Sequence, residues 1–422
     1  MLHAAFATLA LSLLALPGSP QGAPLATFES GGVYDGGGAR LLVVTPVNDT
    51  LIRYRDFDTG GIGILARAAT DRFGTDSARI DFVRTREGRI GRARWSLGAG
   101  AEGRGERRLV PRESFSWTSG GETLSGTLIL PDSSGDAHCA VVVQPGASWT
   151  SRYSSNALET AYTFAAHGIA ALAYDKRGWG ESTGERLVGF DASAADLAAA
   201  VDALGLRFDV DPGRLGVWAL SQGAWIAPLA GTVTDGIGFY VLVGAPGTTP
   251  ARQEIQRAGA LLAALGRPAD HVEAIERFQE ISFRYSVTGR GWSEYIEARQ
   301  VGERQDWLRH VWSPAEPGPD NFLWGRLNGY FNPLPGLLAL DEPLLALWGE
   351  HDVNVLPAVH LPIFEVALAA AGNRSYTLEV VPDAEHVLQV ARSRAPDDAE
   401  SRIAPGVWRR MAEWVRERCG LE

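Results

Sequence analysis

The feature that most constrains the fold is a regular alternation of apolar runs and helical stretches that begins near residue 113. Strand patterns lie at 113–117, 123–130, 140–144, 169–174, 215–219, 239–244, 344–348 and 375–381. Helical patterns lie at 156–167, 191–204, from 222 onward, 357–371 and 406–418. Strands that alternate with helices form a mainly parallel sheet covered by helices. The sequence therefore predicts an α/β fold for most of the chain.

The alternation stops between residues 247 and 341. This stretch contains helical patterns at 253–265, 269–285 and 293–312, together with many aromatic residues. Because it separates two strands of the sheet, we expect a helical cap over the carboxyl edge of the sheet, where open α/β sheets bind ligands.

Residues 27–110 are predicted to form a β-rich domain that precedes the alternation. Candidate strands at 41–47, 51–57, 62–66, 80–84 and 90–95 are separated by turn residues. Apolar and charged residues alternate along several of them, which indicates a sheet with one face in water. Nine arginines lie between Arg79 and Arg108. We expect them on that wet face and assign no chemistry to the region.

The first 26 residues have the pattern of a secretory signal. An apolar run from Ala4 to Leu16 is too short to cross a bilayer as a mature helix, and small residues and prolines follow it. Such signals are removed on export, so the mature chain is expected to be secreted or periplasmic. No other segment reaches about 18 consecutive apolar residues, so no membrane span is expected in the mature chain.

Charge and cysteine content exclude several classes of protein. The net charge of −11 argues against an extended phosphate-binding surface, so nucleic acid is not an expected partner. Lys176 is the only lysine among 39 basic residues, which we attribute to codon usage. No Cys or His spacing typical of a metal site is present, so no metal is expected. The only cysteines are Cys139 and Cys419, and the sequence does not decide whether they form a disulfide.

The sharpest local signal is an apolar strand that leads into Ala219-x-Ser221-x-Gly223 and then into a helix. Small residues two positions before and after a serine allow a sharp strand-to-helix turn that lifts its hydroxyl above the sheet. The turn also aims the helix N-terminus at the reaction site. Ser221 is therefore the predicted nucleophile.

A serine hydroxyl needs a base to take its proton and an acid to orient that base. Asp352 follows the predicted strand 344–348, and His386 follows the strand 375–381. Both residues therefore leave the sheet at the edge that carries Ser221, in the chain order Ser, Asp, His that this turn requires. His386 is the predicted base and Asp352 the predicted acid.

Other titratable residues lie near this pair. Asp383 and Glu385 are alternatives for the acid, but they precede His386 too closely to reach its far nitrogen. His351 and His360 are expected to be ordinary surface or packing histidines.

Acyl transfer also needs donors placed where negative charge develops on the attacked carbonyl. One is predicted to be the backbone N–H of Gln222, directly after the nucleophile, and the other an N–H of the loop 144–148. Pro145 has no N–H, so the donor expected in that loop is Ala147, with Gly146 allowing a close backbone approach.

Together these motifs resemble the α/β-hydrolase superfamily over about residues 113–418, most closely its bacterial esterase and serine-aminopeptidase-like branch. The resemblance includes the signature Asp175-x-Arg177-Gly178-x-Gly180-x-Ser182. It lies between the loop 144–148, here called the oxyanion loop, and the strand-to-helix turn at Ser221, here called the elbow. In such proteins this is a scaffold loop, which implies that Asp175 and Arg177 hold neighbouring loops by charge-assisted hydrogen bonds. The chain departs from the family pattern with Ala219 in place of glycine and with Pro145 where many members have histidine.

The resemblance implies a mostly parallel eight-stranded sheet flanked by helices, with a helical cap and an N-terminal β-rich domain. The expected parts are the signal 1–26, the β-rich domain 27–110, the hydrolase domain 111–246 and 342–422, and the cap 247–341.

The expected activity is that of a serine hydrolase that cleaves a carboxylic ester through an acyl-enzyme. A peptidase or amidase and a thioesterase are alternatives, and a non-catalytic binding protein on the same fold is a distant one. The expected partner is a small-molecule ester or acyl substrate, no cofactor is implied, and the oligomeric state is open. An amide substrate would call for an acidic or carboxylate-binding group in the cap.

Overall fold

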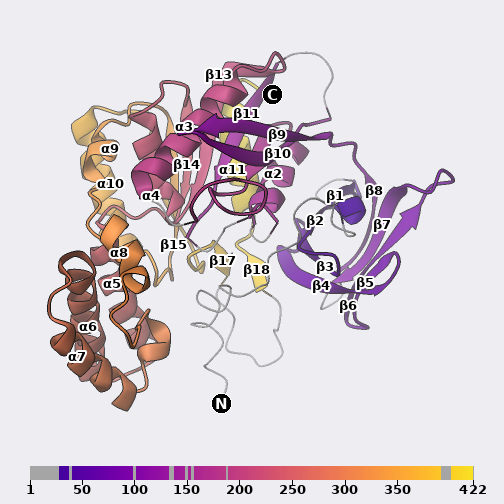
Figure 1. Ribbon diagram of the computed structural model, residues 1–422. Helices are drawn as coiled ribbons and strands as arrows, with labels where there is room; N and C mark the ends of the chain where they lie inside the picture. The colour runs from indigo at the N-terminus through magenta and orange to yellow at the C-terminus, as the bar shows by residue number, and fades with distance from the viewer. Residues whose placement is uncertain are drawn as a thin grey trace.

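The computed structural model describes residues 28–37, 40–97, 101–132, 137–147, 151–153, 156–186, 189–390 and 401–421. The predicted signal, residues 1–26, lies outside them. Two sheets organise the described part of the chain, with a helical cap beside the first and a β-rich domain on the opposite side (Figure 1).

The first sheet has eight strands in the order β16-β15-β14-β13-β11-β12-β10-β9. Their bounds are β9 Arg112–Ser119, β10 Glu122–Ile129, β11 His138–Gln144, β12 Ala170–Tyr174, β13 Val210–Leu220, β14 Phe239–Val243, β15 Leu344–Gly349 and β16 Tyr376–Val381. Strands β11 to β16 pair in parallel, and β9 and β10 pair antiparallel at one end. The central strands are buried along their length, as a parallel sheet with two covered faces requires. The predicted mostly parallel sheet is confirmed.

Helices cover both faces of this sheet. They are α2 Ala157–Ala166, α3 Phe190–Gly205, α4 Gly223–Gly231, α10 Pro357–Ala371 and α11 Val407–Arg418. Buried side chains of α3, α4 and α10 pack on one face and those of α2 and α11 on the other. The sheet is therefore the middle layer of three, and the loops at its carboxyl edge remain free to form a site.

The cap is inserted between β14 and β15. Its helices are α5 Pro250–Ala264, α6 Ala269–Thr288, α7 Trp292–Arg304, α8 Leu323–Asn328 and α9 Leu334–Leu338. Phe278, Tyr295 and Trp307 are buried in a core of the cap's own. Among the helices of the described residues, none is both long and apolar enough to cross a membrane.

The prediction of one helix over 293–312 is wrong in its second half. Helix α7 ends at Arg304, and Asp306 adopts a left-handed backbone with φ of 57°. That conformation cannot continue a right-handed helix. It turns Trp307 back toward Gly302, whose carbonyl accepts the Trp307 N–H, and so brings the indole into the cap core.

The second sheet has ten strands in the order β17-β18-β4-β3-β2-β1-β8-β7-β6-β5. Eight come from the N-terminal region: β1 Gly32–Asp35, β2 Leu41–Pro46, β3 Leu51–Asp56, β4 Gly61–Ala69, β5 Arg72–Gly74, β6 Ala78–Arg84, β7 Ile90–Leu97 and β8 Ala101–Arg107. The other two, β17 Gln389–Val390 and β18 Ser401–Ile403, follow His386. The sequence predicted that residues 342–422 belong entirely to the hydrolase domain, so this contribution of two strands to the second sheet was not predicted.

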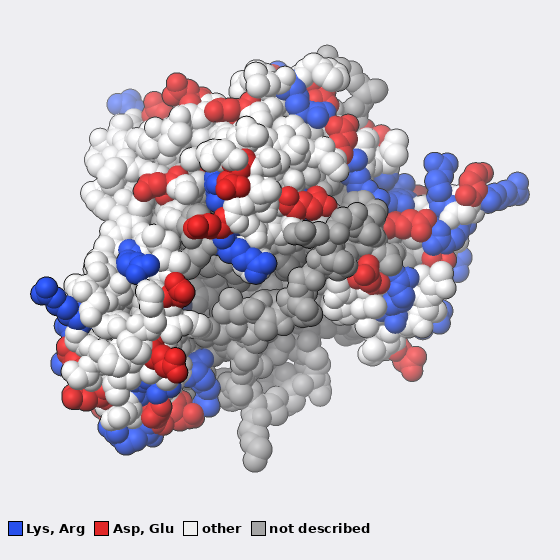
Figure 2. All heavy atoms as spheres, viewed as in Figure 1, with Lys and Arg blue, Asp and Glu red and all other residues white. Residues whose placement is uncertain are grey.

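The arginines from Arg79 to Arg108 lie mainly on the wet face of the β-rich domain, as predicted. Along β7 the exposed Arg92 and Arg94 alternate with the buried Ala93 and Trp95. Several of these arginines are paired with carboxylates, for example Arg92 with Glu106 at 2.8 Å. Figure 2 shows blue and red side chains interspersed over this domain. Such pairing suits a solvated sheet surface.

Cys139 of β11 and Cys419 after α11 form a disulfide, which the sequence left open. Both residues are buried, and the bond joins positions 280 residues apart. Closing so long a loop restricts the unfolded chain.

We expect the double substitution Cys139→Ser, Cys419→Ser to lower the free energy of unfolding by about 2–4 kcal/mol. Denaturant unfolding of the variant and of the oxidised and reduced wild type measures this effect. Reduction should destabilise the wild type to the level of the variant and leave the variant unchanged. Equal midpoints for all the samples would contradict the expectation.

Candidate active site

Ser221 lies at the turn between β13 and α4. Its φ of 54° is in the left-handed region, which a non-glycine residue adopts only when its surroundings hold it there. The Ser221 N–H donates to the Val243 carbonyl at 2.8 Å. A Cβ on Gly223 would lie 2.7 Å from the Gln144 carbonyl oxygen, so only glycine fits two positions after the serine. The predicted strand–turn–helix geometry is therefore present.

The structure brings the three predicted side chains together. His386 Nε2 lies 2.9 Å from Ser221 Oγ, and His386 Nδ1 lies 2.8 Å from Asp352 Oδ2. The other oxygen of Asp352 accepts the N–H groups of Asn354 and Val355, each at 2.8 Å. A buried carboxylate is thus fixed against one imidazole nitrogen, while the other nitrogen faces the serine hydroxyl. In a hydrogen-bonded row of side chains of this kind, the imidazole can take a proton from the serine hydroxyl.

Two glycines that the sequence analysis did not single out allow this approach. A Cβ on Gly244, directly after β14, would lie 2.8 Å from Cε1 of His386. A Cβ on Gly349, at the end of β15, would lie 2.3 Å from the Glu385 carbonyl oxygen. A glycine at the end of a predicted strand, or directly after it, was the available signal, because such a position favours close backbone approach.

The residues that the sequence offered as alternatives to Asp352, and the other histidines near the site, have different surroundings. Asp383 is exposed, and it is Asp352 rather than Asp383 that bonds His386 Nδ1. His351 is exposed, whereas His360 is fully buried on α10 and accepts the Gly247 N–H at 3.0 Å. Burial lowers the pKa of His360 to about 4, although Asp352 opposes that shift. His360 is thus a neutral packing residue of α10 that contacts the start of the cap.

One group of possible metal ligands occurs among the described residues. Glu350, His351 and Asp383 bring ligand atoms within 4.8 Å of one another. All three are exposed, and a Glu350 oxygen already accepts the Asp383 N–H at 3.0 Å. We assign no metal to this turn.

The helix and the loop that carry the predicted oxyanion donors both adjoin Ser221. Gln222 follows it at the start of α4, and Gly146 lies against it: a Cβ on Gly146 would be 3.5 Å from Ser221 Cβ. No residue in the described part of the chain accepts the backbone N–H of Gln222 or of Ala147. Within the described residues both N–H groups are therefore unused.

The scaffold loop holds its neighbours as the resemblance implied. The buried Asp175 accepts the Arg152 backbone N–H at 2.8 Å and the Arg152 guanidinium at 2.7 Å. Arg177 forms a bidentate pair with Asp196 of α3 and also donates to the Ser119 carbonyl at 3.1 Å. Charge-assisted bonds of this kind fix loops strongly.

The environment of His386 tunes its basicity. Burial alone would lower the pKa of His386, but the charge and hydrogen bond of Asp352 outweigh burial, and the charge of Glu254 adds to them. The pKa of His386 therefore lies above its ordinary value.

This shift predicts the acid limb of the pH profile. Only the neutral imidazole accepts a proton, so kcat/KM falls as pH drops through the pKa of His386. Because that pKa is raised, we expect half-maximal activity above about pH 6.5, the ordinary value for histidine. A kcat/KM profile from pH 4 to 9 measures the limb, and a midpoint well below pH 6 would contradict this assignment.

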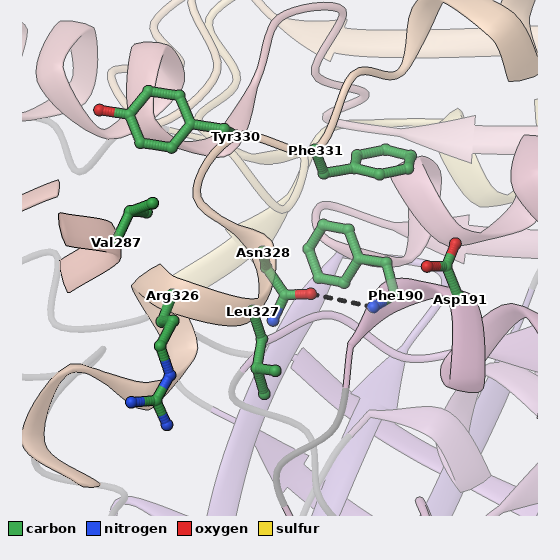
Figure 3. Close-up of a pocket in the computed structure, with 8 residues that line it drawn as sticks. All are labelled: Phe190, Asp191, Val287, Arg326, Leu327, Asn328, Tyr330 and Phe331. Atoms are coloured by element: carbon green, nitrogen blue, oxygen red, sulfur yellow. Dashed lines mark hydrogen bonds between the residues drawn. The ribbon is translucent and has the colours of Figure 1, made fainter. Parts of the chain in front are cut away.

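A half-open cavity of about 310 Å³ lies where the cap meets α3 (Figure 3). Its wall combines aromatic rings with charged groups, among them Phe190, Phe331 and Arg326. Phe190 stacks on Trp225 of α4 with ring centroids 5.6 Å apart, and its N–H donates to the Asn328 side chain at 2.9 Å. The cavity thus adjoins α4, the helix that follows Ser221, although neither Ser221 nor its two partners line it.

Comparisons with known proteins give one family match and several similar solved structures. Residues 135–273 match the family described as serine aminopeptidase, S33. An esterase of Pyrococcus furiosus is 18% identical with a TM-score of 0.46, over 74% of this chain and 90% of the esterase. A proline iminopeptidase of Mycobacterium smegmatis is 17% identical with a TM-score of 0.47, over 72% and 98%. An α/β-hydrolase from Penicillium is 18% identical with a TM-score of 0.47, over 74% and 100%. No curated protein matches the chain significantly.

Proposed function

We propose that this chain, which belongs to the α/β-hydrolase superfamily, is a serine hydrolase that cleaves carboxylic esters through an acyl-enzyme. The observation that carries the proposal is the hydrogen-bonded row from Ser221 Oγ through His386 to Asp352, with distances of 2.9 and 2.8 Å. The family match over residues 135–273 supports a hydrolytic activity. The position of Ser221 at a strained strand-to-helix turn supports its role as the nucleophile.

In the proposed mechanism Ser221 Oγ attacks the ester carbonyl while His386 Nε2 takes its proton. The carbonyl oxygen becomes negative and binds the N–H groups of Gln222 and Ala147. The tetrahedral intermediate then expels the alcohol, which receives the proton from the His386 imidazolium. A water molecule, deprotonated by His386, attacks the acyl-enzyme, and the acid is released as the imidazolium returns its proton to Ser221 Oγ. Asp352 holds the ring throughout and balances its positive charge.

A second candidate, an aminopeptidase-like amidase, is favoured by one specific observation. Glu254 of the cap helix α5 lies near enough to His386 for its charge to raise the pKa of that residue. An acidic group in the cap is what a substrate with a free amine would need. Glu254 is, however, paired with Arg257 at 2.8 Å, which neutralises much of its charge. Ester hydrolysis therefore stays the first proposal.

A substrate panel tests the two proposals against each other. p-Nitrophenyl esters of rising chain length, aminoacyl anilides and acyl-thioesters are compared with wild type and Glu254→Gln. Ester turnover well above the others, and little changed in Glu254→Gln, is expected. Anilide turnover that exceeds ester turnover and falls in Glu254→Gln would replace the esterase proposal with the amidase. Preference for the thioester would indicate a thioesterase.

We further propose that the protein is exported. The apolar run from Ala4 to Leu16 has the pattern of a signal. The buried Cys139–Cys419 disulfide supports this proposal, because structural disulfides persist in oxidising compartments. Cell fractionation with mass spectrometry of the N-terminus tests it, and a cytoplasmic chain with an intact N-terminus would contradict it.

A further inference from the structure

The only lysine of the chain contacts the oxyanion loop, which lies against the nucleophile. Lys176 Nζ donates a hydrogen bond to the carbonyl oxygen of Gly146 at 2.5 Å. This carbonyl and the N–H of Ala147 belong to the same peptide group. In a trans peptide the two point in opposite directions, and the described residues contain no cis peptide bond. A side chain that holds the carbonyl therefore also sets the direction of the N–H.

This peptide group is next to the reacting atoms of the proposed mechanism. A Cβ on Gly146 would lie 3.5 Å from Ser221 Cβ and 3.2 Å from the Leu220 carbonyl oxygen. The loop is thus pressed against the elbow, and a small rotation of its peptide would move the Ala147 N–H relative to Ser221. Donors of this kind act only when they already point to the place where charge develops.

We propose that Lys176 is a positioning residue of the oxyanion hole, which holds the peptide between Gly146 and Ala147 so that the Ala147 N–H faces the developing oxyanion. The inference rests on the proposed function, because it assigns Lys176 a part in acyl transfer. A charged donor on the carbonyl also polarises the peptide group and makes its N–H a stronger donor. Lys176 itself lies behind the peptide and does not touch the substrate.

The charged groups around Lys176 are already paired with others. Its neighbour Asp175 binds Arg152, and its neighbour Arg177 binds Asp196 of α3. No charged group, whether from its own loop, from α3 or from the row around His386, contributes to its shift: burial alone lowers the pKa of Lys176 to about 7. Lys176 is therefore free to interact with the Gly146 carbonyl and changes its charge near neutral pH.

The variant Lys176→Met tests the inference, because it keeps an unbranched side chain but removes the donor. We expect kcat to fall about 10- to 100-fold with KM within about twofold, since a complete oxyanion donor is worth about 10²–10³ in kcat. Active sites are counted by titration with a fluorophosphonate. The Ki of a boronic acid, whose tetrahedral adduct carries an oxyanion, should rise by the same factor as kcat/KM falls. A role in packing alone would not produce this correlation.

The matched control is Arg186→Met, which removes a cation from an exposed position after the same loop, where it contacts Trp179 and the Gly178 carbonyl. Its kcat and boronic acid Ki should equal those of wild type. Unchanged kcat in Lys176→Met, or a loss without the matching change in Ki, would overturn the inference. An inactive Ser221→Ala with a normal Lys176→Met would reject Lys176 alone, whereas an active Ser221→Ala would reject the proposed function.

The variant Lys176→Arg decides the matter if Lys176→Met does not fold. Wild-type kcat is expected to fall as pH rises above about 7, because Lys176 then loses its charge. The guanidinium of arginine stays protonated, so this alkaline limb should be missing from Lys176→Arg. The same limb in both proteins, or no limb in wild type, would overturn the inference.

Discussion

Ser221→Ala is expected to lower kcat by about 10⁴–10⁶-fold and to abolish labelling by a fluorophosphonate. Ser221 Oγ is the only non-hydrogen atom removed, and it is the atom that lies 2.9 Å from His386 Nε2. Without it the ester can be attacked only by water, with whatever help the oxyanion donors give. Ester turnover, corrected for the concentration of folded protein, and a labelling gel measure the two effects.

The matched control is Ser293→Ala, at an exposed position at the start of α7 in the cap. It should label and turn over like wild type. Turnover in Ser221→Ala within tenfold of wild type would reject the acyl-enzyme mechanism, and labelling of Ser221→Ala at wild-type stoichiometry would place the nucleophile elsewhere. Binding of an uncleaved substrate analogue should survive in Ser221→Ala, because the side chain removed is small.

The elbow could be predicted from sequence because everything that defines it is local. The apolar strand, the small residues at 219 and 223 and the helix after Ser221 are neighbours in the chain. The positions of Asp352 and His386 could be predicted because parallel strands end at one edge of a sheet. Asp352 and His386 each follow shortly after such a strand, so both could be expected at the sheet edge that carries Ser221.

The contacts that fix the distances in the site depend on residues far apart and could not be predicted. The approach of His386 to Gly244 joins the ends of β16 and β14 across the sheet, and no local pattern records it. The bond from Lys176 to the Gly146 carbonyl is of the same kind. In the sequence, Lys176 was only a residue of a scaffold loop.

The strands β17 and β18 show a second limit. They contain two and three residues, too few for a period of two to be visible. They form because β4 of the β-rich domain offers an edge with which β18 pairs, and Ile403 donates its N–H to the carbonyl of Gly60, directly before β4, at 2.9 Å. Ala404 in turn donates to the Leu388 carbonyl at 2.8 Å, next to the turn that carries His386. The β-rich domain, to which we assigned no chemistry, thus supports the backbone of the proposed base.

Asp352→Asn is expected to lower kcat by about 10⁴-fold at neutral pH. The backbone N–H groups of Asn354 and Val355 bind one oxygen of the carboxylate, so the amide oxygen of asparagine will occupy that place. The amide NH₂ then faces His386 Nδ1, which must accept rather than donate. The ring proton moves to Nε2, and that nitrogen can no longer take the proton of Ser221.

The same substitution removes the main group that raises the pKa of His386, so its imidazolium should lose its proton at lower pH than in wild type. NMR titration of the ring measures this shift, and steady-state kinetics measure kcat. The matched control is Asp383→Asn, which changes an exposed carboxylate three residues before His386 that was the rival acid in the sequence. Asp383→Asn should retain kcat within about twofold, the range usual for surface substitutions. If Asp383→Asn were the damaging change and Asp352→Asn the mild one, the acid of the proposed mechanism would be Asp383.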